Sequence, residues 1–336
     1  MSEPITHAII GNLREDYFIT PAGEAHVRVL GGNAVHAAAG ARLWTDGVAV
    51  VSRVGSNYPK PWLDQIKARG LDVSHVKVLA EPHDTRTFYA YLSHEERQDT
   101  DPTSHFARIG QPLPRELIDY EASTIGQESR DKFSPLAVRP SDLSEAILDA
   151  RAVHLAPMDF MTHRTVPETL RRAGVRYVTL DPSVRYMQPS FHHDLRYIVS
   201  GLDAFLPSEM EVRAYFRDDL TDMWEAAATF GALGARIVVV KLGPRGQYVY
   251  ETDSGRQWHV PAYACVVRDV TGAGDAYCGG FLVGLSQTGD PVESALRGAI
   301  SASIVIEGLG ALYALDSTPG LAQARLKSLR EAVRRI

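Results

Sequence analysis

The sequence predicts an α/β fold in which helices cover both faces of a mainly parallel sheet. Short, apolar, β-branched runs alternate with segments of helical spacing along most of the chain. The strand-like runs do not alternate with polar residues, which is typical of strands that are buried on both faces. The chain has 336 residues, of which 45% are hydrophobic and 23% charged, so it can bury a core of the size that this fold needs.

The predicted strands and helices follow one another as repeated strand–helix units. The strands are expected at residues 8–10, 48–54, 152–155, 177–180, 204–206 and 237–240. The helices are expected at residues 34–43, 62–68, 166–173, 223–233, 276–285, 292–306 and 321–333. Because strand–helix–strand crossovers are right-handed, this order places helices on both sides of the sheet.

Three segments interrupt this order. Residues 17–30 and 85–92 have an extended pattern, with Tyr89 and Tyr91 alternating with apolar neighbours, and we expect them to pair as a small accessory sheet. Residues 94–140 are polar and contain the turn signal Asp99-Thr100-Asp101-Pro102. We therefore expect an irregular excursion there, with one short helix near 115–120.

Composition and charge exclude several classes of protein. Subtracting 41 acidic from 35 basic residues gives a net charge of −6, and the sequence has no basic run that would suit a nucleic-acid polymer. No apolar stretch approaches the roughly 18 residues that span a bilayer, and the N-terminus has no secretory pattern, so a cytoplasmic location is expected. Cys265 and Cys278 form no metal motif, so they are expected to be buried free thiols.

The strongest local motif is Asp269-Val270-Thr271-Gly272-Ala273-Gly274-Asp275, followed at once by a predicted helix. Small residues let the backbone approach a ligand closely, and amides at a helix start attract anions. A carboxylate in the first turn lies where a base for an attacking hydroxyl belongs. The alternative is that Asp275 only caps the helix.

Three further motifs stand where ligands bind in α/β folds. Gly31-Gly32-Asn33 opens the first helix, where Asn33 either contacts a polyhydroxyl ligand or caps the helix. Ser208-Glu209-Met210-Glu211 follows a strand, and its glutamate suits a hydrated Mg²⁺ or a capping box. Gly243-Pro244-Arg245-Gly246 is either a phosphate-covering turn or a plain β-turn.

Together these motifs resemble the ribokinase-like PfkB family of sugar and nucleoside kinases, in the family's order and over residues 6–316. The resemblance implies ATP-dependent, Mg²⁺-assisted phosphoryl transfer to a hydroxyl. It also implies one doubly wound domain over residues 1–336, with a small β-sheet lid from about 13–30 and 85–110. In the family that lid is often a dimer interface, so the resemblance admits a homodimer here.

The resemblance also implies roles for individual residues. Asp275 matches the catalytic base, and the amides of Gly272, Ala273 and Gly274 match the anion hole. Asp16, Gly32 and Asn33 match the acceptor site. Lys241, Gly243, Gly246 and Ser303 match the nucleotide side.

The metal positions match less completely. Glu211 matches the glutamate that holds Mg²⁺ through water, although Ser208 stands where the family usually has Asn. Asp269 and Thr271 match positions that form a K⁺ loop in several members. Asn57 replaces a usual Asp, which affects either substrate choice or a local turn.

Three functions follow from this comparison of motifs. The first is a kinase for a small sugar, and the second is a nucleoside kinase, for which the lid tyrosines and the excursion would cover a base. The third is a non-catalytic ligand-binding protein on the same scaffold, against which the intact Asp275 motif argues.

Overall fold

The computed structural model describes residues 4–94, 96–217 and 222–335. Its larger sheet has ten strands in the order β14-β13-β12-β11-β10-β9-β8-β1-β4-β5. Their bounds are β1 His7–Ile10, β4 Val48–Val54, β5 Val76–Val78, β8 Ala152–Leu155, β9 Tyr177–Leu180, β10 Ala204–Phe205, β11 Ile237–Lys241, β12 Gln247–Glu251, β13 Arg256–Val260 and β14 Arg334–Arg335. The strands from β5 to β11 are parallel, and β12, β13 and β14 continue the sheet antiparallel, which confirms the mainly parallel prediction.

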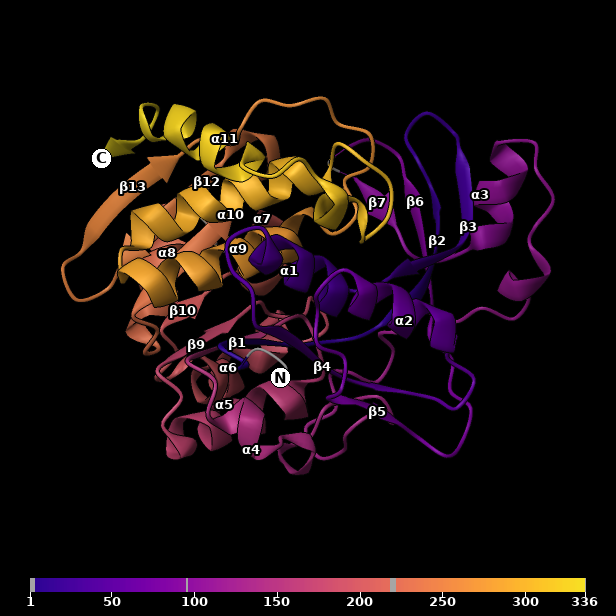
Figure 1. Cartoon of the computed structure of the whole chain (residues 1–336), viewed down its shortest axis with the longest axis horizontal. Coiled ribbons are helices and arrows are strands. Elements are labelled where there is room, and N and C mark those ends of the chain that lie inside the picture. The colour runs from indigo at the N-terminus through magenta and orange to yellow at the C-terminus, as the bar shows by residue number, and fades with distance from the viewer. Residues whose placement is uncertain (1–3, 95, 218–221, 336) are drawn as a thin grey trace.

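Helices cover both faces of this sheet (Figure 1). Their bounds are α1 Asn33–Arg42, α2 Lys60–Ala68, α3 Pro102–Arg108, α4 Glu145–Leu148, α5 Phe160–Ala173, α6 His192–Val199, α7 Glu209–Phe216, α8 Met223–Ala232, α9 Ala273–Thr288, α10 Pro291–Val305 and α11 Leu321–Arg330. Successive residues of one strand point to opposite faces of the sheet and so pack into different cores. Ile10 and Val238 pack with α5, α6 and α8 on one face. Ile9 and Val239 pack towards α1, α9 and α10 on the other. Strands that are apolar on both faces therefore hold two layers of helices.

The smaller sheet lies beside the large one, at the right of Figure 1. Its order is β3-β2-β6-β7, with β2 Arg14–Ile19, β3 Ala25–Gly31, β6 Arg86–Tyr91 and β7 Arg97–Gln98. Strands β2 and β6 are parallel, and the other two pairs are antiparallel. These strands come from the two segments that the sequence marks as extended and from the start of the excursion.

The two faces of the small sheet differ in chemistry. Tyr17, Phe88 and Ala90 point into an apolar cluster with Phe106 of α3 and Leu117. The next side chains along β2 belong to the opposite face, so Arg14 and Asp16 are turned away from this cluster. That opposite face borders the candidate active site.

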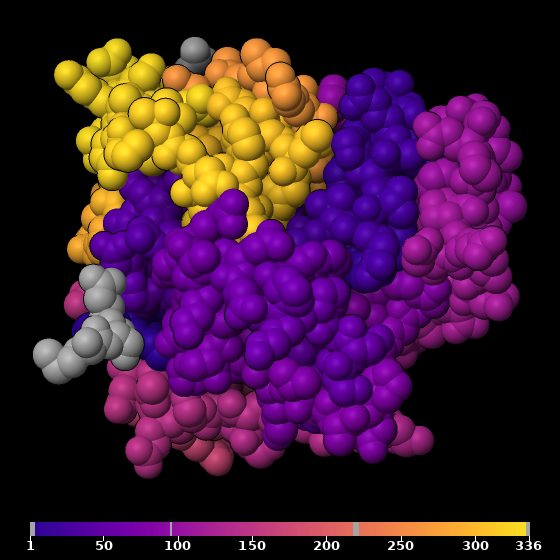
Figure 2. All heavy atoms as spheres, turned by 45° about the vertical axis from the view of Figure 1, so that its right-hand side comes forward, coloured from indigo at the N-terminus to yellow at the C-terminus, as the bar shows by residue number. Residues whose placement is uncertain are grey.

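The excursion is more ordered than the sequence predicts. Pro102–Arg108 forms α3, which the sequence analysis misses, and the helix expected near 115–120 is a single 3₁₀ turn, Arg115–Leu117. Asp101 caps α3 through a hydrogen bond from the Ser104 amide, and Pro102 occupies its first turn, so the expected turn is in fact a helix start. In Figure 2 this magenta segment lies against the outer side of the indigo strands.

A few other boundaries also differ from the prediction. Helix α5 begins at Phe160 instead of residue 166 and contains Pro167. Strand β10 spans two residues instead of three. Cys278 is buried as expected, but Cys265 is only half-buried. In the part of the chain that is described, no helix has the length and hydrophobicity needed to cross a bilayer.

Candidate active site

The motif at residues 269–275 forms a tight turn that opens helix α9. Gly272 is the N-cap with φ 75° and ψ 5°, so the alternative in which Asp275 caps the helix is wrong. A Cβ atom on Gly272 would lie 2.1 Å from the ring of buried His36, which requires glycine for two independent reasons. Asp275 instead occupies the first helical turn, where the residue is partly buried.

The amides of this turn point outward from the helix start. The amide of Ala273 donates to the carbonyl of Val270 at 3.2 Å. Within the described ranges, the amides of Gly272, Gly274 and Asp275 have no acceptor. Three free N–H groups at the positive end of a sixteen-residue helix form a cradle for an anion.

Lys241, at the end of β11, lies beside this cradle. Its Nζ atom is 3.5 Å from the position that a Cβ atom on Gly274 would take. The ammonium group pairs with Asp181 at 2.5 Å and lies 3.6 Å from the sulfur of Cys278. Burial alone would lower the pKa of Lys241, but Asp181 and Cys278 outweigh it and raise the pKa, so the side chain stays cationic.

The chemistry of Asp275 follows from these neighbours. Burial raises the pKa of its carboxyl group above the ordinary value, while Lys241 and Arg97 oppose the rise and Glu211 adds to it. A carboxylate with a raised pKa accepts a proton more readily than one in open solvent. The geometry therefore places a proton acceptor next to an anion cradle and a fixed cation.

Glu211 lies at the start of α7, where it caps the helix and adds a negative charge near Lys241 and Asp275. Its Oε2 atom accepts hydrogen bonds from the amide and hydroxyl of Ser208 at 2.7 and 2.8 Å, which confirms the capping-box alternative. Burial raises the pKa of this carboxyl group, and Lys241 opposes the rise. The charge of Glu211 is thus felt both at Lys241 and at Asp275.

The turn at residues 31–33, which the sequence predicts to bind the acceptor, opens helix α1. Gly32 has φ 103°, and a Cβ atom on it would lie 2.3 Å from the carbonyl oxygen of Asn12. Asn33 is the first residue of α1 and not its cap, which corrects the capping alternative. Its side chain accepts from the Asn12 amide and donates to the Pro157 carbonyl, both at 2.7 Å, and so fixes the loop after β1.

Asp16 lies against this turn. A Cβ atom on Gly31 would lie 1.7 Å from its Oδ2 atom, and the amide of Gly32 donates to the carboxylate. Burial raises the pKa of Asp16 to about 7, which the Gly32 amide and Arg14 partly oppose. Asp269 and Asp275 add to the rise in this pKa, so the carboxylate of Asp16 interacts electrostatically with the two carboxylates beside the anion cradle.

Strands β6 and β7 close the site from the small sheet. The hydroxyl of Tyr91 lies 2.8 Å from the hydroxyl of Thr271. Exposed Arg97 places its guanidinium 4.7 Å from the ring centre of Tyr89. The small sheet thereby brings a cation and two aromatic rings to the edge of the cradle.

Comparison with known proteins assigns this arrangement to a family. The model of the pfkB family carbohydrate kinases matches residues 145–318, which is more than half of the chain and includes the anion cradle. The chain belongs to the pfkB family of carbohydrate kinases. It is accordingly a phosphotransferase with a hydroxyl acceptor.

Individual relatives of this PfkB-family kinase differ in their acceptors. A cytidine kinase of Thermococcus kodakarensis is 27% identical, over 86% of this chain and 91% of that protein. A 2-dehydro-3-deoxygluconokinase of Thermoproteus tenax is 30% identical, over 84% and 80%. An Escherichia coli structure assigned as ribokinase II, solved with ATP and Mg²⁺, shares the fold with a TM-score of 0.70 at 18% identity, over 96% and 99%.

The remaining predicted residues of this PfkB-family kinase lie in three other settings. Gly243 is the first residue of a 3₁₀ turn and Gly246 follows its end, and a side chain on Gly243 would meet nothing within 4 Å. Ser303 is buried in α10, where its hydroxyl donates to the Ile300 carbonyl and accepts from Arg325. The amide of Thr271 donates to Asp269 at 2.9 Å, and burial raises the pKa of that carboxyl group.

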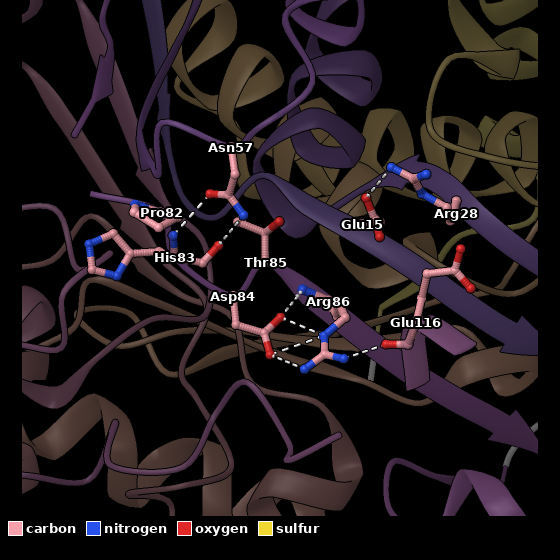
Figure 3. A pocket seen from close by; sticks show the side chains of 9 residues that line it. All are labelled: Glu15, Arg28, Asn57, Pro82, His83, Asp84, Thr85, Arg86 and Glu116. Carbon is pink, nitrogen blue, oxygen red and sulfur yellow. Dashed lines mark hydrogen bonds and ion pairs between the residues drawn. The ribbon is translucent and has the colours of Figure 1, made fainter. Parts of the chain in front are cut away.

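Asn57 shapes a loop outside the cradle of this PfkB-family kinase. Its side chain accepts from the amide of His83 at 2.9 Å and donates to the carbonyl of His83 at 3.1 Å. These two bonds fit the interpretation of Asn57 as a local turn residue. The loop borders a cavity of about 520 Å³ on the outer side of the small sheet (Figure 3).

That outer cavity is distinct from the cradle. Glu15 reaches this cavity from the face of β2 opposite to Asp16. Among the charged side chains that line the cavity, Glu15 pairs with Arg28 and Asp84 pairs with Arg86 (Figure 3). The charges within each pair offset one another, and Glu116 is a further carboxylate in the lining.

Several residues at the site of this kinase are absent from the sequence prediction. They are Asp181, Cys278, Arg14 and Arg97. Tyr91 is one of the predicted lid tyrosines, but its contact with Thr271 is not predicted. Asp181 directly follows a predicted strand, so the rule that selects Glu211 after the next strand would have found it. Arg14, Arg97 and Cys278 reach the site from β2, β7 and α9, and a local motif does not mark them.

Proposed function

We propose that this PfkB-family kinase transfers the γ-phosphoryl group of ATP to a hydroxyl group of a small sugar. The observation that carries the proposal is the position of Asp275 in the first turn of α9, beside three free amides and Lys241. Phosphoryl transfer needs a proton acceptor near the attacking hydroxyl and fixed positive groups around the transferring phosphoryl. The first turn of α9 offers both.

The roles divide between two sides of the turn. Asp275 accepts the proton of the attacking hydroxyl, and its raised pKa brings proton affinity closer to working pH. The amides of Gly272 and Gly274 donate to the oxygens on which negative charge accumulates. The amide of Ala273, which the sequence analysis also places in the anion hole, is already bonded to the Val270 carbonyl. Lys241 adds a cation whose position is held by Asp181.

The donor set fits a hydrated Mg²⁺. Asp181 is buried with its Oδ1 atom enclosed and without a partner, and its charge interacts with that of Glu211. The described ranges hold no cluster of three metal-binding side chains, which matches an ion that keeps most of its waters. When bound, Mg²⁺ would neutralise phosphate charge beside these carboxylates. The related Escherichia coli structure, which contains ATP and Mg²⁺, supports the binding of both by this chain.

Other assignments remain predictions. Asp269 and Thr271 are proposed to hold K⁺, and Gly243, Gly246 and Ser303 to contact the nucleotide. The chain is proposed to form one domain, with a lid from about residues 13–30 and 85–110. A homodimer through this lid also stays a prediction.

The acceptor is proposed to bind at Asp16, Gly32 and Asn33. Asp16 accepts hydrogen bonds from sugar hydroxyls, and Gly32 lets the ligand approach the backbone. The 30% identity to a 2-dehydro-3-deoxygluconokinase supports a sugar as the acceptor. A nucleoside is the second candidate, because Tyr89 presents an aromatic ring near the site and one relative is a cytidine kinase.

The test is ADP release by the purified protein with Mg²⁺-ATP and a panel of pentoses, hexoses, sugar acids and nucleosides. We expect turnover on one class of acceptor, and its loss in Asp275→Asn. Retained ATP binding with no turnover on any acceptor would favour the non-catalytic alternative.

A further inference from the structure

Arg14 is a buried cation for which the described chain supplies no direct partner. Its residue is only 7% exposed, yet no hydrogen bond or ion pair within 4.0 Å engages its guanidinium among the described residues. Its nitrogens are also not among the enclosed, unpartnered atoms of the described chain, so they keep contact with open space. A buried guanidinium without an anion is unfavourable unless a ligand completes it.

The surroundings of Arg14 place it on the acceptor side. Arg14 and Asp16 are two residues apart on β2 and so share the face that points away from the apolar cluster of the small sheet. Tyr89 of β6 interacts with its charge from the same face. Arg14 therefore belongs with Asp16 and the turn at residues 31–33.

Asp16, Asp159 and Asp84 act on the charge of Arg14 at longer range, and Asp84 already pairs with Arg86. Asp159 accepts from the amide and hydroxyl of Ser134 at 2.8 and 3.0 Å, and Asp16 accepts from the Gly32 amide. Burial raises the pKa of Asp16 to about 7 and also raises that of Asp159, and neither carboxylate forms an ion pair with Arg14 in the part of the chain that the structure describes. The guanidinium fork thus stays available for a direct partner.

We propose that Arg14 binds a carboxylate of the acceptor, so that the sugar which this kinase phosphorylates is a sugar acid. This inference rests on the proposed function, because it places the acceptor at Asp16 and the turn at residues 31–33. Arginine pairs with a carboxylate through two parallel hydrogen bonds, which orients the sugar as well as binding it. A phosphate dianion fits less well, since one guanidinium would face two charges beside Asp16 and Asp159. A nucleoside has no anion to offer.

The first test uses the unaltered protein. ADP release is measured with Mg²⁺-ATP and aldonic or 2-oxo-3-deoxyaldonic acids, each compared with its amide, its neutral sugar alcohol and a sugar phosphate. We expect kcat/KM for the acid to exceed that for the amide by about 10- to 100-fold, the scale of a hydrogen-bonded ion pair. Isothermal calorimetry without ATP should show the same order of affinities.

The second test uses matched arginine variants. Arg14→Gln should lower kcat/KM for the acid about 10- to 100-fold while changing that for the amide much less, and Arg14→Lys should fall between. Arg28→Gln is the control, because exposed Arg28 pairs with Glu15 on the opposite side of β2. Thermal melting establishes that each variant folds.

The outcomes separate this inference from the proposed function. Turnover on a neutral sugar, a nucleoside or a sugar phosphate with no preference for acids would overturn the role of Arg14 and leave the kinase in place. Binding of the acid with no turnover on any acceptor would support Arg14 and reject the proposed catalysis. An acid preference that survives Arg14→Gln would assign the carboxylate to another residue.

Discussion

The hydroxyl of Tyr91 on strand β6 lies 2.8 Å from the hydroxyl of Thr271, one residue before the N-cap of α9. Both residues are buried, at 5% and 7% exposure. The small sheet is thus joined to the anion cradle by one hydrogen bond between residues 180 positions apart. Any movement of the sheet away from the site must break this bond.

Tyr91→Phe should therefore loosen the closed arrangement without altering the charges of the site. We expect the coupling energy between the side chains of Tyr91 and Thr271 to be about 1 kcal/mol, the usual net value of a neutral hydrogen bond. A double-mutant cycle with Thr271→Val, measured on KM for the acceptor, gives this coupling. Additive effects of the two changes would show that the bond does not hold the lid.

Asp275→Asn should lower kcat by about 10²-fold or more, because the amide keeps the size of the carboxylate but cannot accept the proton. Asp290→Asn is a matched control. Asp290 caps α10 through the amides of Val292 and Glu293, a capping role that asparagine can fill. Steady-state kinetics and circular dichroism compare the two variants, and equal turnover in both would remove Asp275 from the mechanism.

Gly272→Ala and Gly289→Ala compare two glycines of similar backbone conformation, with φ 75° and 70°. Both changes incur the roughly 1–2 kcal/mol cost of a left-handed residue. A side chain on Gly289 meets nothing within 4 Å, whereas one on Gly272 overlaps the ring of His36. Denaturant unfolding should show an extra loss of about 1–3 kcal/mol for Gly272→Ala, together with weaker ATP binding. Equal stability of the two variants would contradict this packing.

Asp16 should make the free protein less stable as the pH rises. Its pKa is about 7 in the folded chain against an ordinary value of 3.8, so the folded state holds a proton that the unfolded state releases. The stabilising contribution of the neutral carboxyl is complete below about pH 4 and disappears as the pH passes 7. Asp16→Asn should thus gain melting temperature relative to the parent protein between pH 5 and pH 8. A constant difference across that range would contradict the raised pKa.

The two cysteines should differ in their reactivity towards a thiol reagent. Cys278 is completely buried, and burial raises its pKa well above the ordinary value, while Cys265 is half-buried with a smaller rise. Ellman's reagent should therefore modify Cys265 slowly and leave Cys278 unmodified until the protein unfolds. The Cys265→Ser variant provides the control, because Cys278 is its remaining cysteine. Modification of this variant while it is folded would show that Cys278 is accessible.

The sequence predicts the parts of the fold that depend on local pattern. Strands such as β4 and β8 match their expected bounds because apolar runs buried on two faces have a distinct composition. Helix α3 is missed because Asp101-Pro102 also suits a turn, and only the cluster around Phe106 favours the helix. Propensity alone does not separate the two.

The same limit applies to the site. The motif at residues 269–275 is contiguous, so its glycines and Asp275 can be selected from the sequence. Arg14 and Arg97 carry no motif, because their surroundings are created when β2 and β7 come to lie against distant segments. Asn33 stays a predicted acceptor contact, and its hydrogen bonds with the Asn12 amide and the Pro157 carbonyl depend on segments that are distant in the sequence.

Helix α3 and Leu117 seal the outer face of the small sheet with residues of the same chain. Tyr17 and Phe88, both without solvent exposure, would be uncovered if residues 102–117 were removed. The small sheet thus carries a miniature apolar core of its own. A second subunit would find this face already occupied, which leaves the strand edges of the lid as the places where two copies could join.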